Sequence, residues 1–225
     1  MKKILSIFLV IIMILTGWFV YNHWFSKSTR TDNWKNKIEY FSMNNSLQSG
    51  DIIFQTSLSD QSTAIQQATG SKYSHCGIIF KENGDFFVFE AIQPVKSTSL
   101  KEWITRGKGE HFVVKRLKNA EEILTPSVLQ KMKVIGKEFN GKNYDLTFEW
   151  SDEKIYCSEL IWKIYQRATG IEIGKLEKLS DFDLDNEAVR IKLKERYGNQ
   201  IPFDETVISP KSIFNSELLE TIYEN

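Results

Sequence analysis

Cys157 is the residue of this sequence best placed to act as a nucleophile. The residues after it carry an apolar stripe at helical spacing and end at Gly170, so Cys157 is expected in the first turn of a helix. There the free backbone N–H groups and the positive end of the helix dipole favour an anion, which eases ionisation of the thiol. The alternative is that Cys157 is a small buried hydrophobic residue without chemistry.

A nucleophilic cysteine needs a base, and His75 is the histidine that falls within a recognisable strand pair. Asn83-Gly84 is a strong hairpin signal between two runs rich in aromatic and β-branched residues. With the turn at that dipeptide, Gly77 opposes Glu90, and His75 becomes the diagonal neighbour of Glu90 on the same face. A carboxylate that orients a histidine is the third member of a generalised catalytic triad.

Other interpretations of these residues stay open. A loop of three residues would move Glu90 to the opposite face, a strand histidine can be a hydrogen-bonded core residue, and an edge carboxylate can guard a sheet. Against the last of these, Glu90 stands in an apolar run where an unpartnered charge is costly to bury. Cys76 points away from His75 and is expected in the core, although a Cys76–Cys157 disulfide would remain open to an exported domain and would consume the nucleophile.

No cofactor or metal is expected. His23 and His111 have no acidic residue or cysteine at ligand spacing, and the two cysteines are far apart in the sequence. A redox role has little support because no Cys-x-x-Cys pair occurs.

The stretches that carry these residues resemble, in order and spacing, the circularly permuted papain-like cysteine amidases of the YiiX/YaeF type. These enzymes are relatives of the NlpC-type cell-wall peptidases and of the lecithin retinol acyltransferase group. The matching segments are Ser49-Gly50-Asp51-Ile52-Ile53-Phe54, Tyr73-Ser74-His75-Cys76-Gly77-Ile78-Ile79, Phe89-Glu90-Ala91 and Tyr156-Cys157-Ser158-Glu159-Leu160-Ile161. With the Ser-Pro start of the last helix they cover about residues 47–215.

The resemblance implies a papain-like fold in which the histidine strand precedes the cysteine helix. It implies that Cys157 is the nucleophile, His75 the base and Glu90 the residue that orients His75. The segment Gly141-Lys142-Asn143-Tyr144-Asp145 is similar to one that puts a tyrosine beside the nucleophile in NlpC-type enzymes, so Tyr144 becomes a candidate oxyanion or substrate contact. Asp51 is a candidate structural residue.

The reaction implied is acyl transfer through a thioester on Cys157. An exported domain would cleave peptide amides of the cell wall, whereas a membrane-facing site would favour acyl lipids, as in an acyltransferase or thioesterase on the same triad. A non-catalytic binding module with a papain-like shape is the remaining alternative.

The N-terminus has the pattern of a membrane segment. Lys2 and Lys3 precede residues 4–20, which carry no charge and span roughly 26 Å as a helix, close to the ~30 Å of a bilayer core. Trp18, Tyr21 and Trp24 follow at the depth of the headgroups. No small-x-small cleavage pattern follows, which favours an uncleaved anchor over a signal peptide.

Three regions are therefore expected: an anchor or signal segment over residues 1–25, a polar tether over 26–40 and a permuted papain-like amidase domain over 41–225. Basic residues beyond the apolar segment favour a cytoplasmic domain, but a short basic start before an apolar run is typical of export. We expect a membrane-anchored protein whose soluble domain is extracytoplasmic.

Composition excludes several function classes. The 225 residues are 41% hydrophobic and 13% aromatic, with 12 glycines and 4 prolines, which excludes collagen-like and wholly disordered chains. Lys+Arg and Asp+Glu are both 29, so no broad basic surface for nucleic acid is expected. Two cysteines cannot form a disulfide scaffold.

The element pattern predicts an α+β domain, an antiparallel sheet packed against helices. Strands are expected at 52–55, 73–81, 86–92 and 111–117. Helices are expected at 63–69, from Ser99 to about Gly107, from Thr125-Pro126 to about Phe139, and from Cys157 to Gly170. Residues 181–200 are predicted to be a charged helical insertion or loop, and Ser209-Pro210 to open a final helical stretch toward Ile222.

Overall fold

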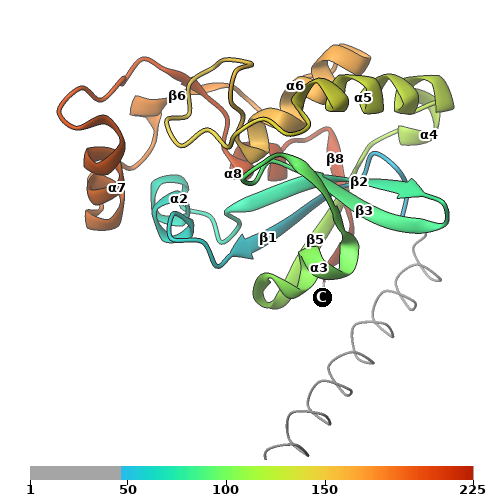
Figure 1. Cartoon of the computed structure of the whole chain (residues 1–225), viewed down its shortest axis with the longest axis horizontal. Coiled ribbons are helices and arrows are strands. Elements are labelled where there is room, and N and C mark those ends of the chain that lie inside the picture. The colour runs from blue at the N-terminus through green and yellow to red at the C-terminus, as the bar shows by residue number, and fades with distance from the viewer. Residues whose placement is uncertain (1–46, 225) are drawn as a thin grey trace, which may run out of the picture. The chain divides into compact units, whose positions relative to one another are not determined.

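A sheet of six antiparallel strands in the order β4-β3-β2-β1-β5-β8 is the centre of residues 47–224, the part of the chain that the computed structural model describes (Figure 1). Its strands are β1 (Ile52–Ser57), β2 (His75–Glu82), β3 (Asp85–Glu90), β4 (Lys96–Ser99), β5 (Gly107–Leu117) and β8 (Leu219–Glu224). The helices are α2 (Ser62–Thr69), α3 (Leu100–Thr105), α4 (Ala120–Ile123), α5 (Pro126–Phe139), α6 (Cys157–Thr169), α7 (Glu187–Tyr197) and α8 (Pro210–Phe214), with a 3₁₀ turn η1 at Leu179–Asp181. Two short strands, β6 (Glu177–Lys178) and β7 (Thr206–Val207), form a separate pair.

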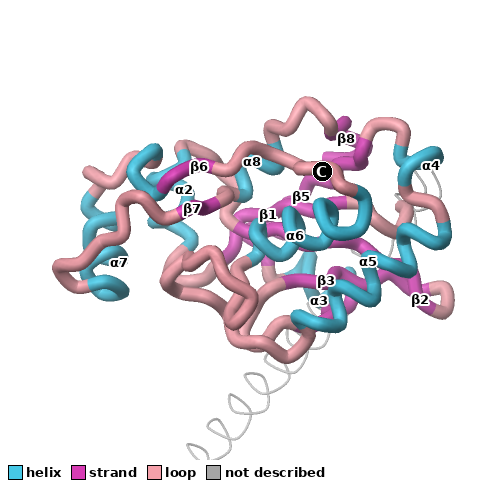
Figure 2. The backbone as a smooth tube through the Cα atoms, turned by 90° about the horizontal axis from the view of Figure 1, so that it is seen from above, coloured by secondary structure: helices cyan, strands magenta, loops and turns pink. Residues whose placement is uncertain are grey.

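Helices cover both faces of the sheet. Figure 2 shows α5 and α6 lying across one face, and Figure 1 shows α3 on the other. The α5/α6 face carries the main apolar core, to which β2 contributes Cys76, Ile78 and Phe80. Because faces alternate along a strand, the opposite face of β2 presents His75 and Gly77. The predicted α+β architecture, an antiparallel sheet packed against helices, is confirmed.

The β2–β3 hairpin has the predicted turn and register. Asn83 and Gly84 both have positive φ, 51° and 94°, which is the backbone that a tight two-residue hairpin turn requires. The paired residues are Glu82 with Asp85, Phe80 with Phe87, and Ile78 with Phe89. Glu90 is therefore the next residue on the β3 side, opposite Gly77, where β3 ends.

The predicted helix boundaries follow from their capping residues. The Ser99 side chain accepts a hydrogen bond from the Glu102 N–H at the start of α3. Thr125 does the same for Val128 at the start of α5, with Pro126 as the first helical residue. Gly170 ends α6 in the left-handed conformation that glycine adopts at no steric cost (φ 78°).

The prediction of a final helical stretch toward Ile222 is wrong. Helix α8 ends at Phe214, and Leu219–Glu224 instead forms the edge strand β8 on β5. A turn at Asn215 ends the helix, and the run that forms β8 is rich in residues that favour a strand.

Residues 181–200 contain one helix, α7, that is less solvated than its charge indicated. Val189 and Leu193 are buried, and they form a small second core with Ala64 of α2 and Leu179. This core packs α7 against α2.

The predicted anchor (1–25), the whole predicted tether (26–40) and residues 41–46 of the predicted amidase domain lie outside the described residues. Within residues 47–224, every helix is too short or too polar to cross a bilayer.

Candidate active site

Cys157 is the first residue of α6, as the sequence predicts. The start of this helix is held by the segment after β7, because the Ser158 hydroxyl donates to the Ile208 carbonyl (2.7 Å) and the Ile208 N–H donates to the Tyr156 hydroxyl (3.0 Å). Cys157 is 2% exposed and is a free thiol, as is Cys76. The Cys76–Cys157 disulfide that the sequence left open is therefore not formed.

His75 begins β2 and is bound to Glu90. Its Nε2 lies 2.6 Å from Glu90 Oε2, and its ring stacks on Trp103 of α3 with centroids 6.0 Å apart. Gly77 makes this approach possible, because a Cβ there would lie 2.4 Å from a Val88 methyl carbon and 3.4 Å from the Glu90 Cβ. The diagonal pair predicted from the hairpin register is thus formed.

Glu90 has no exposed surface and is held by two further donors. Thr98 Oγ1 donates to Glu90 Oε1 (2.5 Å), and Arg106 donates to the same oxygen (2.6 Å). Burial alone would raise the pKa of Glu90, but the hydrogen bonds from His75 and Thr98 and the charges of His75 and Arg106 together lower it. Glu90 is therefore a carboxylate at neutral pH.

Burial disfavours a charged imidazole, but the hydrogen bonds to Cys157 and Glu90 outweigh it and raise the pKa of His75 to about 9. Since Nε2 is taken by Glu90, Nδ1 is the ring nitrogen available to the thiol.

The Cys157 thiol is acidified. Its pKa is lowered well below the usual value by a hydrogen bond from Cys76 and then by the hydrogen bond and charge of His75, against the effect of burial. Burial raises the pKa of Cys76, which therefore keeps its proton and can donate it. Cys76 is in the core, as predicted, but it faces α6 and contacts Cys157, which the sequence argument did not foresee.

Tyr144 and Cys157 line the same pocket. Tyr144 forms an isolated β-bridge with Ile155, just before the cysteine helix, and its N–H donates to Gln93 Oε1 (2.7 Å). The Tyr144 hydroxyl accepts a hydrogen bond from Gln61 Nε2 (2.9 Å). Burial raises the pKa of Tyr144 well above its usual value, so its hydroxyl is protonated.

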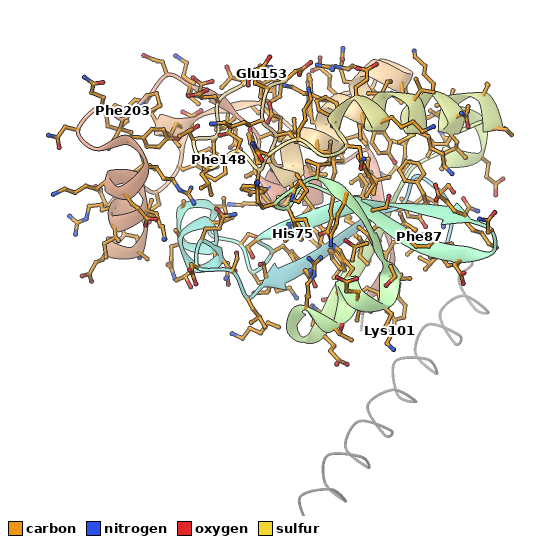
Figure 3. The ribbon with its side chains drawn as sticks, viewed as in Figure 1. His75, Phe87, Lys101, Phe148, Glu153 and Phe203 are labelled. Carbon is orange, nitrogen blue, oxygen red and sulfur yellow. The ribbon has the colours of Figure 1, made fainter. Side chains whose placement is uncertain are left out.

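The pocket beside Cys157 is largely apolar. Most of its wall comes from α2, α7 and the segments around them, and its side chains include Ile65, Phe148, Leu184, Val189, Leu193 and Val207. Lys192 and Arg196 of α7 add positive charge to the lining. Figure 3 labels His75 and Phe148 on the side of the sheet toward α2.

Two other sequence candidates lie outside this group. Asp51 accepts from the Arg116 side chain at 2.7 and 2.8 Å and from the Gln48 N–H, a buried structural pairing. His111 Nε2 lies 3.7 Å from Glu224 Oε1, at the strand pair β5–β8.

Sequence reasoning missed Thr98, Arg106, Gln61 and Arg196. Thr98 faces Glu90 from the adjacent strand β4, but a single threonine in a short polar run carries no recognisable signal.

The chain resembles known proteins over nearly all of its described part. Residues 46–223 match the model of a family described as permuted papain-like amidase enzymes, YaeF/YiiX, C92 family. The uncharacterised protein YiiX of Escherichia coli strain K12 is 47% identical over 175 residues, which is 78% of this chain and 85% of that protein. A crystal structure described as the metalloprotein YiiX of Escherichia coli O157:H7 matches with a TM-score of 0.76 and 48% identity, covering 79% of this chain and 97% of that one.

The description as a metalloprotein applies to the Escherichia coli O157:H7 protein. Within residues 47–224 of this chain, no group of three or more histidine, cysteine, aspartate or glutamate side chains is arranged to hold a metal ion. The described side chains therefore do not fit a metal ion.

Proposed function

Because this chain belongs to the permuted papain-like amidase family, a family of cysteine amidases and peptidases, we propose that Cys157, His75 and Glu90 are the catalytic triad of its amide hydrolysis. The observation that carries the proposal is that His75 interacts with both Glu90 and Cys157. One ring nitrogen is bound to a buried carboxylate, and the same histidine helps to lower the pKa of a thiol at a helix N-terminus.

The resting state is an ion pair of thiolate and imidazolium, since the pKa of Cys157 is lowered and that of His75 is raised. The Cys157 thiolate attacks the carbonyl carbon of the substrate. His75 then donates its proton to the leaving nitrogen as the C–N bond breaks, which leaves a thioester on Cys157.

Hydrolysis of the thioester restores the enzyme. The now neutral His75 takes a proton from water while the water oxygen attacks the thioester carbonyl, and the sulfur leaves as thiolate beside imidazolium. Glu90 holds the ring in place and stabilises its charge in both half-reactions.

Two donors are available to the oxyanion that forms in each half-reaction. The backbone N–H of Cys157 is free of an intrahelical partner because it lies in the first turn of α6. The protonated Tyr144 hydroxyl lines the same pocket. Donors aimed at the developing charge are worth about 10²–10³ in kcat each.

We propose peptide amides of the cell wall, or related amides, as the substrates. The apolar pocket beside Cys157 favours a second candidate, a lipid-directed acyltransferase or thioesterase, since such a wall suits an acyl chain better than a polar peptide. In that case an acceptor amine or alcohol replaces water in the second half-reaction.

We also propose that the apolar residues 4–20 anchor the protein in a membrane with its catalytic domain extracytoplasmic. This topology would bring cell-wall peptides or membrane lipids within reach of the site.

Labelling with iodoacetamide at pH 6 tests the triad. An ordinary thiol is almost wholly protonated there, whereas Cys157 should be a thiolate and react quickly. We expect Cys157→Ser to abolish labelling and His75→Ala to slow it at least tenfold, with His111→Ala as the matched control at the wild-type rate. Labelling of His75→Ala at the wild-type rate would refute the activated thiol.

The substrate class is tested separately. Wild-type protein is incubated in parallel with acyl lipids and with cell-wall peptides, and the mass added to Cys157 is measured. A peptidyl adduct supports the amidase, and a fatty-acyl adduct supports the lipid-directed alternative.

A further inference from the structure

Three side chains connect α7 to the pocket that holds Cys157. Arg196 of α7 donates from its NH2 group to Gln61 Oε1 (2.7 Å), and Gln61 donates from Nε2 to the Tyr144 hydroxyl (2.9 Å). Gln61 is the residue that precedes α2, where its backbone starts the helix. The three residues are distant in the sequence and meet only in the fold.

The direction of these hydrogen bonds is fixed by chemistry. A guanidinium group has donors and no acceptor, so the oxygen of the Gln61 amide must face Arg196. Its NH2 group then faces Tyr144, whose oxygen must act as acceptor. The hydroxyl hydrogen of Tyr144 is consequently directed elsewhere, and within residues 47–224 it is donated to no other group.

Arg196 is itself held in place. Its guanidinium lies 5.0 Å from the centre of the Phe148 ring, and the neighbouring Tyr197 hydroxyl donates to the Thr147 carbonyl. The small core of Val189, Leu193 and Ala64 packs α7 against α2. The position of Arg196 therefore depends on the docking of α7 on α2.

We propose that Gln61 and Arg196 are positioning residues for the acyl-transfer step: together they hold the Tyr144 hydroxyl with its proton directed at the carbonyl oxygen of the substrate. This inference rests on the proposed function of Cys157 and gives residues 181–200 a role in it. Each donor in the series also polarises the next, which strengthens the last hydrogen bond.

Substitution of Gln61 by glutamate reverses the series without changing its shape. A carboxylate only accepts, so it still pairs with Arg196 but now draws the Tyr144 proton toward itself. A purely structural role of Gln61 predicts that Gln61→Glu is tolerated, since it gains an ion pair. The positioning role predicts that it damages catalysis about as much as Tyr144→Phe.

Two reactions at Cys157 separate the oxyanion from the thiol. Acylation by p-nitrophenyl butyrate forms an oxyanion, whereas disulfide exchange with 4,4′-dithiodipyridine involves no carbonyl group. Both are measured at a pH where the thiol of each variant is fully ionised, as judged by the pH profile of the exchange reaction. The variants are Tyr144→Phe, Gln61→Glu and Arg196→Ala, with Arg190→Ala, an exposed arginine of the same helix, as the matched control.

We expect kcat for the ester to fall about 10²- to 10³-fold in Tyr144→Phe and in Gln61→Glu. It should fall about tenfold in Arg196→Ala, where one hydrogen bond from a charged group is lost. KM, the exchange rate and the activity of Arg190→Ala should stay within about threefold of wild type.

The inference is overturned if folded Gln61→Glu keeps its ester kcat, or if it loses disulfide exchange to the same extent as acylation. Failure of the proposed function looks different, because the wild-type protein itself would then give no acyl adduct on Cys157.

Discussion

Glu90 and Glu159 are both completely buried, yet their charge states differ. Glu90 faces three donors from β2, β4 and the residue after α3, and its pKa is lowered. Glu159, in the first turn of α6, pairs with Lys163 (2.7 Å) and meets the Tyr156 N–H at 3.5 Å, and burial raises its pKa to about 8. Burial by itself raises the pKa of both carboxyl groups.

The difference shows that the number and strength of donors decide which buried carboxyl stays ionised. Glu90 gathers hydrogen bonds to both oxygens, which hold it as a fixed negative charge beside His75. Glu159 has one close cation, and the nearby charge of Asp145 further favours its neutral form. Glu159, which lies two positions after Cys157 in the same first turn of α6, is thus a carboxyl suited to structure rather than to catalysis.

Replacing Glu90 by glutamine should have a far larger effect on catalysis than replacing Glu159. In Glu90→Gln the amide oxygen can still accept from Thr98 and Arg106, but the carboxylate that, together with Cys157, raises the pKa of His75 is gone. We expect kcat to fall by about 10²–10⁴, and the alkaline limb of the pH profile, set by the pKa of about 9 of His75, to move to lower pH.

Glu159→Gln is the matched control for that measurement and should retain kcat within about threefold. Steady-state kinetics of both variants across pH 5–10 check the prediction. Equal losses in the two variants would mean that buried charge in general, rather than the Glu90–His75 contact, supports activity.

The two glutamates should also have opposite effects on the pH dependence of stability. The pKa of Glu159 is raised from 4.5 to about 8, so the folded state binds its proton more tightly and the free energy of unfolding falls as pH rises between these values. By pH 7 the loss is at most about 3 kcal/mol. Glu90, whose pKa is lowered, stabilises the fold above its unfolded pKa and loses that contribution as pH falls through its folded pKa.

Urea unfolding of wild type and both glutamine variants between pH 4 and 8 measures these slopes. Glu159→Gln should flatten the decline toward pH 8, and Glu90→Gln should flatten the decline toward acid. If the free energy of unfolding rose by the same amount from pH 5 to pH 8 in the wild type and in Glu159→Gln, the first expectation would be contradicted.

The positions of Glu90 and Cys157 could be predicted from the sequence, because each is fixed by residues close to it in the chain. Asn83-Gly84 fixes the hairpin register, which sets Glu90 opposite Gly77 and next to His75. The apolar stripe and Gly170 define α6, which puts Cys157 at its N-terminus. In both cases a few consecutive residues determine the geometry.

The surrounding donors were not predictable, because they arrive through tertiary packing. Thr98 reaches Glu90 only because β4 pairs with β3, and Arg196 reaches Gln61 only because α7 docks on α2. The prediction for the end of the chain was wrong for another reason. Pro210 does start a helix, but no periodic pattern fixed its length, and residues 219–224 pair with β5.

Thr98→Val removes one donor from Glu90 and leaves the carboxylate in place. Valine has nearly the shape of threonine, so the change isolates the 2.5 Å hydrogen bond. We expect the free energy of unfolding to fall by about 1–3 kcal/mol. The pKa of Glu90 should rise, so the loss of stability in acid should begin at a higher pH. The ester kcat should decrease only about two- to fivefold, because Arg106 still donates to the same oxygen.

Thr105→Val is the control, since that exposed hydroxyl donates to the Glu102 carbonyl within α3 and not to Glu90. Urea unfolding across pH and ester kinetics give both readouts. If Thr98→Val left the acid limb of stability where it is in wild type, the Thr98 donor would not contribute to the ionisation of Glu90. The charge of Arg106 and the contact with His75 would then have to account for the whole difference from Glu159. A shifted acid limb with kcat nearly retained would show that the ionisation of Glu90 depends on the sum of its donors, whereas the orientation of His75 depends on the one oxygen that it contacts.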